Sequence, residues 1–383
     1  MHPTVTPTLT TDQAAAHNAA VARLWDDYGR GVNERVPITF ASDEALWLSL
    51  TGHSFREFYT DAEVQLLTQL AGQAWMCQTI VHDQRFGLPE EAWTVVPRFW
   101  MDEPEVFGCE VVIQEETFAW SRPLDLSRHD VLSYLADLDV EAAIRRSHLW
   151  ELYCRMRELA AGMTWHDLPV RVAMSGGGTH GIFTTACHVR GPEQLCLDLA
   201  EDPDFARQFL DLMVDQTLAR IKAWHRLAET GTELPLPGWG IADDSLQLIS
   251  AATYRDCVLP SHQRLYAAMT HGGRSIHLCG QATHHYASLY HDLGIRTLDG
   301  PGPFADFGEL LAAYPELTIN AQADHTVLLL GPQSEIERMM HGMLTPAAKQ
   351  PGRLQVMGFL VPETPLQNVR YLYEVGVTAG RIG

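Results

Sequence analysis

Hydrophobic residues follow two different rhythms along the chain, and the change falls near Pro169. Before it, apolar residues recur at helical spacing and predict helices over residues 10–29, 54–83 and 127–163. Thr11 or Asp12 is the expected N-cap of the first helix. Residues 90–123 are instead rich in β-branched and aromatic side chains. This predicts a hairpin-rich excursion in which the tryptophans serve packing.

After Pro169, short apolar segments alternate with amphipathic helices. The predicted strands lie at residues 169–176, 234–243, 274–280, 295–302, 317–324 and 353–360. Strand–helix alternation is typical of a parallel sheet. With a strand at 35–41 and one more upstream, it predicts an α/β fold, a closed (β/α)8 TIM barrel with an N-terminal helical and hairpin extension. An open doubly wound sheet is the alternative, but no GxGxxG motif follows the first strand to favour it.

The same rhythm predicts the domain organisation. Residues 1–30 form a Thr/Pro-rich tail and the first helix, and residues 31–383 form a single barrel domain. Within that domain, residues 41–165 contain the excursion, which we expect to cover the barrel mouth.

Charge and composition narrow the function classes. The formal net charge of -21 predicts a surface that repels nucleic acid and anionic membranes. No apolar run approaches the roughly 20 residues of a membrane-spanning helix, and the N-terminus lacks the pattern of a signal peptide. The seven scattered cysteines form no close-paired motif, which favours a reducing compartment and mostly buried thiols. The expected location is therefore the cytoplasm.

Polar side chains end several of the predicted strands. In an eight-fold barrel the carboxyl ends of the strands meet at one mouth, so side chains far apart in sequence converge there. The predicted catalytic carboxylates are Asp243, Asp244 and Asp324. The predicted substrate contacts are Trp239, Asn320, Gln322 and Met357.

His277 and Cys279 form a candidate metal pair in the segment IHLCG. On a strand, residues two apart face the same side, so both could reach one ion. Imidazole and thiolate are ligands that zinc prefers. The alternative is a histidine and a buried cysteine that simply line a core strand. His284 and His285 begin the next helix, where at most one of them faces the site.

Asp243 and Asp244 admit two interpretations. They could act as a carboxylate pair for proton transfer, or the segment ADDS could cap a helix or turn. Gly176, Gly177 and Gly178 favour a flexible strand-to-helix loop over an anion-binding loop.

Four segments carry further motifs in a fixed order. They are a Phe-Thr followed by EDPDF (181–217), an Asp-Asp followed by a Pro and a Leu (243–265), IHLCG (276–280), and a Thr-Pro helix start (362–375). Together they resemble the uroporphyrinogen decarboxylase superfamily, most clearly over residues 165–377. The Arg-rich substrate motif of the true decarboxylases has no counterpart after Arg35. The chain therefore resembles the zinc-dependent methyltransferase branch more closely.

The resemblance implies a (β/α)8 barrel and a zinc ion held by the His and Cys of His-x-Cys and by a second cysteine. That cysteine would fall at about Gly358, whereas Cys279 is the last cysteine in the chain. The candidates to replace it lie at strand ends and are Asp244, Asp324 and His325. We include His325 with His277 and Cys279 among the predicted metal ligands.

Three functions follow as hypotheses. The resemblance implies a methyl- or alkyltransferase that moves a methyl group between a corrinoid protein or small methyl donor and an acceptor such as a thiol, assisted by zinc. The alternative is a decarboxylase-like lyase that acts on a carboxylated small molecule without metal, through Asp243 or Asp244. The third is a catalytically degenerate barrel that binds a ligand or partner. The resemblance also implies that any corrinoid is carried by a separate protein, and it suggests a homodimer.

Overall fold

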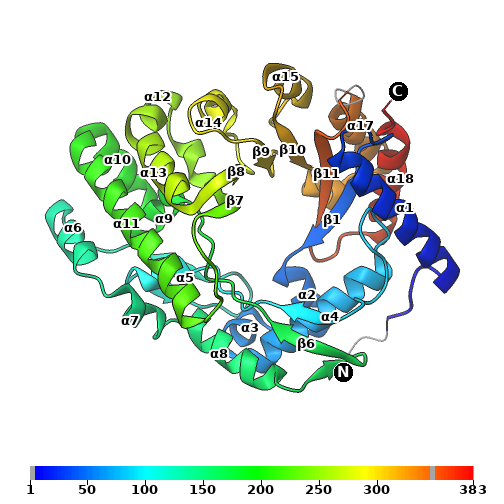
Figure 1. Ribbon diagram of the computed structural model, residues 1–383, viewed down its shortest axis with the longest axis horizontal. Coiled ribbons are helices and arrows are strands. Elements are labelled where there is room, and N and C mark those ends of the chain that lie inside the picture. The colour runs from blue at the N-terminus through cyan, green and yellow to red at the C-terminus, as the bar shows by residue number, and fades with distance from the viewer. Residues whose placement is uncertain (1–4, 346–349, 383) are drawn as a thin grey trace. The chain divides into compact units, whose positions relative to one another are not determined.

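The computed structural model describes residues 5–345 and 350–382, and the chain divides into two compact units (Figure 1). Unit 1 comprises Met1–His53, Leu67–Glu91 and Arg296–Gly383, and unit 2 comprises Ser54–Leu66 and Ala92–Ile295. The first four residues of the predicted tail lie outside the described residues. The single barrel domain expected from residue 31 onward stays a prediction.

Unit 1 is built on a parallel sheet with the strand order β1-β11-β10-β9. Its strands are β1 (Ile38–Ser42), β9 (Thr297–Asp299), β10 (Thr318–Gln322) and β11 (Leu354–Leu360). Its helices are α1 (Thr11–Gly29), α2 (Glu44–Thr51), α15 (Phe307–Ala313), α16 (His325–Leu330), α17 (Gln333–Leu344) and α18 (Leu366–Ala379). Helices α17 and α18 pack side by side, and α18 contacts β1 (Figure 1). Alternate residues of β11 are fully buried, as a strand with one face against helices requires.

A buried polar cluster fixes the edge of this sheet in unit 1. Asp83 is fully buried and accepts hydrogen bonds from the Arg35 guanidinium at 2.6 and 2.7 Å and from the Ile38 amide at 2.7 Å. Next to it, buried His82 Nδ1 accepts the Phe40 amide N–H at 2.8 Å. Both contacts hold strand β1 through its backbone, so they stabilise the position of the strand independently of its side chains.

The buried His82 predicts a loss of stability in acid. Burial lowers the pKa of His82 from 6.5 to about 4. The unfolded chain then binds more protons between pH 6.5 and about 4, so the free energy of unfolding falls as the pH falls through this window. Because the unfolded chain takes up one extra proton at this histidine, the contribution of His82 to the free energy of unfolding should drop by about 2 kcal/mol from pH 7 to pH 5.

Urea unfolding at a series of pH values measures this change. His82→Asn should flatten the acid slope of the stability curve, whereas His341→Asn, at an exposed histidine of the same unit, should leave it unchanged. Equal slopes in the wild type and His82→Asn would contradict the assignment.

Unit 2 is organised along the long helix α11 (Pro203–Leu227). Helices α6, α7, α9, α10 and α13 pack against it (Figure 1). Those five helices are α6 (Arg128–Ala136), α7 (Val140–Ile144), α9 (Ile182–Arg190), α10 (Pro192–Glu201) and α13 (Leu259–Met269). The unit also contains α3 (Phe55–Thr60), α5 (Asp102–Val106), α8 (His148–Ala160), α12 (Ala251–Thr253) and α14 (Tyr286–His291). Helix α4 (Ala62–Thr79) has residues in both units. The apolar stripe of α11, with Phe209, Met213 and Trp224 fully buried, forms the core of unit 2.

The strands of unit 2 fall into three groups. Strands β7 (Leu236–Ala242) and β8 (Thr270–His277) pair in parallel. Strand β6 (Leu168–Val172) pairs in parallel with β2 (Trp93–Val95) and antiparallel with β5 (Thr164–Trp165). Strands β3 (Glu110–Val112) and β4 (Trp120–Arg122) form an antiparallel hairpin.

A strand forms at each of the seven predicted positions, but several end earlier than predicted. Strand β6 ends at Val172 rather than at residue 176, and β8 ends at His277 rather than at residue 280, so Cys279 lies beyond the strand. Two further details differ from expectation. Within the excursion, β3 and β4 form the expected hairpin, but β2 joins β6 in parallel. The N-cap of α1 is Thr10, which forms a capping box with Gln13, whereas Thr11 or Asp12 was the predicted N-cap. The fold is α/β with parallel strand pairs. Closure into eight strands is not shown, because in the described part of unit 2 β6 pairs with β2 and β5 and not with β7.

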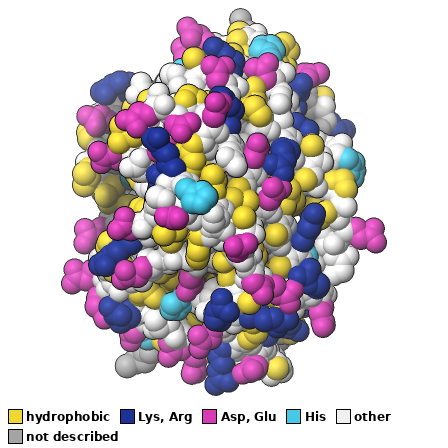
Figure 2. All heavy atoms as spheres, turned by 90° about the vertical axis from the view of Figure 1, so that its left-hand side faces the viewer, with side chains coloured by type: hydrophobic (Ala, Val, Ile, Leu, Met, Phe, Trp, Pro, Cys, Tyr) yellow, Lys and Arg dark blue, Asp and Glu magenta, His cyan; other side chains and the backbone are white. Residues whose placement is uncertain are grey.

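On the face drawn in Figure 2, described acidic, basic and hydrophobic side chains are interspersed, and no single basic area dominates it. Among the described residues, no helix combines the length and the hydrophobicity needed to cross a membrane.

Candidate metal centre

The ends of β7 and β8 build the candidate centre in unit 2. The two strands pair with Ala242 opposite His277, so both chains leave the sheet at the same edge. The turn after β7 is tied to β8 because the Asp243 amide donates to the His277 carbonyl at 3.1 Å. One residue further on, Asp244 Oδ1 accepts the Cys279 amide N–H at 2.8 Å. These two hydrogen bonds, one between backbone groups and one from a backbone amide to the Asp244 carboxylate, bring Asp244 beside the His-x-Cys segment.

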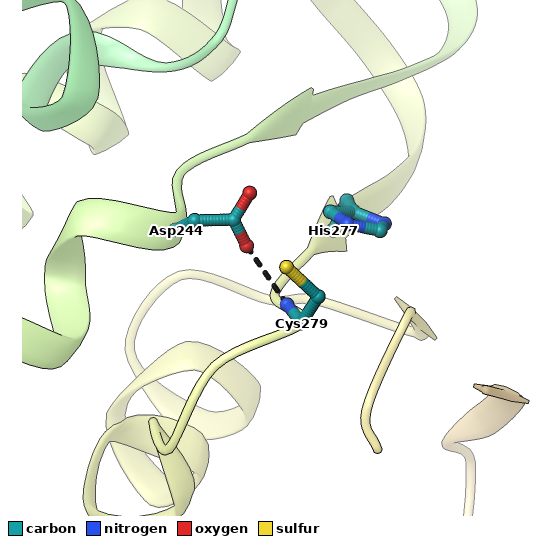
Figure 3. A group of neighbouring side chains, drawn as sticks. All are labelled: Asp244, His277 and Cys279. Atoms are coloured by element: carbon teal, nitrogen blue, oxygen red, sulfur yellow. Dashed lines mark hydrogen bonds between the residues drawn. The ribbon is translucent and has the colours of Figure 1, made fainter. Parts of the chain in front are cut away.

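Asp244, His277 and Cys279 form one compact group (Figure 3). One ligand atom from each residue lies within 4.8 Å of the other two. Asp244 and His277 are half-buried, and Cys279 is exposed, in contrast to the other described cysteines, which are buried or half-buried. The group is therefore open to an ion from solvent while two of its members are held by the strand ends.

The donor set suits zinc. A carboxylate oxygen, an imidazole nitrogen and a thiolate sulfur are all zinc ligands, and their separation allows a single ion to contact all three after small side-chain adjustments. Three protein ligands also leave one coordination position open, which is the usual arrangement of a catalytic zinc site. The residues present thus fit the metal that the resemblance implies.

Asp243 is placed differently from its neighbour. Its side chain is fully buried. The carboxylate accepts hydrogen bonds from the Phe183 and Thr184 amides, at 3.1 and 2.7 Å, and from the Thr184 hydroxyl, at 2.7 Å. His262 Nε2 lies 2.8 Å from Asp243 Oδ2. Asp243 therefore caps the N-terminus of α9 from a distant segment, which agrees with the capping interpretation except that the helix is not the adjacent one.

Gly181, which precedes α9, shows how close this contact is. Its φ of +87° lies in the left-handed region, and an added Cβ would meet Asp243 side-chain atoms at 2.6 Å. Only glycine allows Asp243 to reach the amides at the start of the helix.

Asp243→Asn is predicted to destabilise the fold. The amide would present an N–H₂ group to backbone and hydroxyl donors in a fully buried place. The free energy of unfolding should fall by about 2 kcal/mol, measured by urea unfolding. The matched control is Asp244→Asn, whose half-buried side chain can still accept the Cys279 amide N–H. Equal stability of the two variants would contradict the capping role.

The other predicted site residues lie elsewhere or make other contacts. Asn320, Gln322, Asp324, His325 and Met357 belong to unit 1, whereas the Asp244, His277 and Cys279 group belongs to unit 2. Asn320 donates to Asp299 beside it on β9, and Gln322 pairs with Met357 in register on β11. Asp324 is the N-cap of α16, and His325 is the exposed first residue of that helix. The roles predicted for these residues stay predictions.

Trp239 also makes a contact that the strand pattern did not specify. Its indole packs edge-on against buried Tyr266 of α13, with ring centroids 5.6 Å apart. Part of the indole is therefore covered by a helix of unit 2, and the substrate contact predicted for Trp239 stays a prediction.

A buried charged cluster next to the centre was missed by the sequence patterns. Arg220 of α11 is only 1% exposed. Its Nη1 lies 2.9 Å from Asp102 Oδ2 and 3.3 Å from the Gly176 carbonyl, and Nη2 donates to the Gly178 carbonyl. Glu103 lies 3.6 Å from the same guanidinium. The sequence contained one sign of this cluster: Arg220 is a charged residue on the otherwise apolar stripe of α11.

The electrostatics of the cluster follow from burial and pairing. Burial raises the pKa of Asp102 to about 7, although Arg220 opposes the shift. Burial also opposes ionisation of Glu103, but Arg220, His180 and Thr179 outweigh it and lower the Glu103 pKa to about 2. In His180, burial is outweighed by the hydrogen bond and charge of Glu103, so the His180 pKa is raised. The cluster thus holds one firmly ionised carboxylate and one that titrates near neutrality.

This cluster lines a pocket of about 320 Å³ within unit 2. The pocket is bounded by the segment after β2, by the loop after β6 that contains the three glycines, and by Ala242. Ala242 pairs with His277 and stands two residues before Asp244, so one wall of the pocket is the strand end that carries the candidate metal ligands.

Comparisons with known proteins place the chain in a family. The family described as "Uroporphyrinogen decarboxylase (URO-D)" matches residues 100–377. A methylated-thiol–coenzyme M methyltransferase from Methanosarcina mazei is 35% identical over 103 residues, which span 26% of this chain and only 26% of that protein. A solved methyltransferase structure from Methanosarcina mazei shares the fold, with a TM-score of 0.61 at 17% identity over 93% of this chain and 98% of that chain. Because the family match covers more than half of the chain, the protein belongs to the uroporphyrinogen decarboxylase family.

Proposed function

We propose that the protein is a methyl- or alkyltransferase of the uroporphyrinogen decarboxylase family. It transfers a methyl group between a small methylated donor, or a corrinoid carried by a partner protein, and a thiol acceptor. The observation that carries this proposal is the convergence of Asp244, His277 and Cys279 into one group that could hold a metal ion. The relative that methylates coenzyme M from methylated thiols and the methyltransferase of the same fold support the same class.

Asp244 is the proposed replacement for the missing second cysteine. Its Oδ1 is tied to the Cys279 amide, so the carboxylate lies beside the thiol before any ion binds. Zinc held by Asp244, His277 and Cys279 would lower the pKa of a thiol substrate and keep it as a thiolate. His325 remains the alternative third ligand that the strand-end pattern predicts.

The transfer step balances without an oxidant. The acceptor sulfur uses a lone pair to form the new carbon–sulfur bond while the bond between the methyl group and the donor atom breaks. The donor atom keeps that bonding pair, and the thiol proton passes to solvent. The pocket beside the strand end would hold the methylated compound so that its methyl group faces the acceptor.

The lyase alternative is not favoured. Proton transfer by Asp243 would need a carboxylate that can reach a substrate, whereas this one is fully buried and bonded to Thr184 and His262. We further infer that the strands close into a (β/α)8 barrel, that the corrinoid protein is a separate partner, and that the protein forms a homodimer.

Metal analysis and a transfer assay test the proposal together. The protein is purified without an affinity tag, its zinc content is measured, and methylcobalamin is supplied with 2-mercaptoethanol or coenzyme M as acceptor. We expect near-stoichiometric zinc and thiol-dependent loss of methylcobalamin absorbance that is abolished by chelation and restored by zinc. A protein that binds no zinc and transfers no methyl group to either thiol would overturn it.

A further inference from the structure

His180, in the loop between β6 and α9, has a carboxylate behind one of its ring nitrogens. Its Nδ1 lies 3.1 Å from Glu103 Oε1. The same oxygen accepts the His180 amide N–H at 2.8 Å. The hydroxyls of Thr179 and Thr185 donate to Glu103 Oε2 at 2.7 and 3.0 Å. Glu103 is therefore held at both oxygens, and it fixes the backbone and the ring of His180 together.

The hydrogen bond to Glu103 decides which nitrogen of His180 exchanges a proton. Although burial disfavours the ionised form of Glu103, Arg220 and His180 outweigh it and lower the Glu103 pKa to about 2. An ionised carboxylate can only accept a hydrogen bond, so Nδ1 of His180 carries a proton and donates it. Nε2 is then the nitrogen that gains or loses a proton when the ring titrates.

Nε2 of His180 can be reached by a small molecule in the pocket. His180 is one of the residues that line the pocket, and 32% of its side chain is exposed. Nε2 has no hydrogen-bond partner among the described residues, yet it is not one of the polar atoms that are hidden from solvent. One ring nitrogen is thus anchored by a carboxylate, and the other is accessible.

The walls beside His180 are largely apolar. Val96, Pro97 and Phe99 follow strand β2 along one side of the pocket. Trp100 is 40% exposed, and its ring centroid lies 5.9 Å from that of His180. An exposed indole offers a flat apolar surface to a small molecule. An apolar compound that lies on Trp100 therefore has its neighbouring atoms beside the imidazole.

We propose that His180 gives a proton to the leaving atom of the methylated substrate, and that Glu103 positions the ring for this step. The inference rests on the proposed methyl transfer. As the bond between the methyl group and a thioether sulfur breaks, the bonding pair stays on that sulfur, and the Nε2 proton of the imidazolium is transferred to it. The sulfur leaves as a neutral thiol. His180 then recovers a proton from solvent, which has taken up the proton of the acceptor thiol.

The charges around the ring favour its protonated form. Burial disfavours the imidazolium, but the hydrogen bond and the charge of Glu103 outweigh it and raise the pKa of His180. Arg220 on α11 opposes this shift, and Asp102 on α5 supports it. His188 on α9 interacts with the same ring, and burial together with the charge of His180 lowers the His188 pKa.

Two aryl methyl thioethers test the proposal. Thioanisole and 4-nitrothioanisole share one body, but the second releases a much less basic thiolate, which needs less assistance from an acid. Each is supplied with zinc and coenzyme M to the full chain, and methylated coenzyme M is measured. His180→Asn should lower kcat with thioanisole by about 100-fold with little change in KM. With 4-nitrothioanisole the loss should be smaller by a factor of about three or more.

A control and a pH profile separate proton donation from a structural role. His129→Asn, at an exposed histidine on α6, should change neither rate. In the wild type, kcat with thioanisole should fall as the pH rises through the His180 pKa, because the imidazolium is the acid. The fall should be absent in His180→Asn, and Glu103→Gln should move it to lower pH by removing the charge that favours the imidazolium. Equal losses with the two thioethers, or a fall that persists in His180→Asn, would overturn the proposal.

The outcomes also distinguish this inference from the proposed function. A protein that methylates coenzyme M from methylcobalamin but from neither thioether would retain the transferase and reject a proton donor in this pocket. A protein that methylates coenzyme M from none of the three donors would reject the transferase itself.

Discussion

Cys279→Ser is expected to reduce the zinc affinity of the protein by about 100-fold or more, and thiol methylation should fall with it. Loss of an outer contact to a metal ligand already costs 10- to 100-fold in affinity, so loss of a thiolate ligand should cost at least the upper value. Cys279 is the exposed member of the group and makes its ordered polar contact through its backbone amide. The serine variant should therefore fold normally. Competition with a chromophoric chelator measures the affinity.

A second pair of variants, Asp244→Ala and His325→Ala, identifies the third zinc ligand. Asp244→Ala should lower the zinc affinity by about 10-fold or more, because the carboxylate lies within 4.8 Å of the other two ligand atoms. His325→Ala tests the alternative from the strand-end pattern. Cys154→Ser, at a half-buried cysteine on α8, serves as the control. Zinc binding that persists in Cys279→Ser and Asp244→Ala alike would show that the metal is held elsewhere.

The strand positions of this site were predictable because they follow from local patterns. Apolar residues in the segments around Ile241 and Ile276 are buried as β7 and β8. The end of β8 was not predicted, because the expected strand continued to Gly280, whereas β8 ends at His277. What the pattern could not separate was Asp243 from Asp244. The two are adjacent, yet one is fully buried under α9 and the other lies beside Cys279. That difference depends on contacts with Thr184, about sixty positions away.

The charged cluster was hidden for the same reason. Asp102 and Arg220 stand 118 positions apart, so no local spacing connects them. In sequence, Asp102 and Glu103 belong to an acidic break in an aromatic stretch, which is typical of a solvated turn. Their burial arises only when α5 and α11 come together in the tertiary structure. A cation on an otherwise apolar helical stripe is the one local sign of such a partner.

Arg220→Met should destabilise the protein by about 3–5 kcal/mol, because it removes the cation that compensates two buried carboxylates. Urea unfolding measures the change. Arg155→Met is the matched control, since its ion pair with Glu158 is exposed on both sides and should cost no more than about 1 kcal/mol. A cost of that small size for Arg220→Met would contradict the role of the cluster.

A double variant tests whether the cost arises from the uncompensated carboxylate. Asp102→Asn removes the charge that burial already disfavours, as the raised pKa of about 7 indicates. The folded state holds this proton more tightly than the unfolded state, so the Asp102 contribution to stability is complete below pH 3.8 and is lost as the pH rises to about 7. Asp102→Asn should therefore restore part of the stability lost in Arg220→Met, by about 1–2 kcal/mol at pH 8. Because Glu103 stays ionised in the same place, the rescue should remain incomplete, and strictly additive effects of the two substitutions would show that the carboxylate and the guanidinium are not coupled.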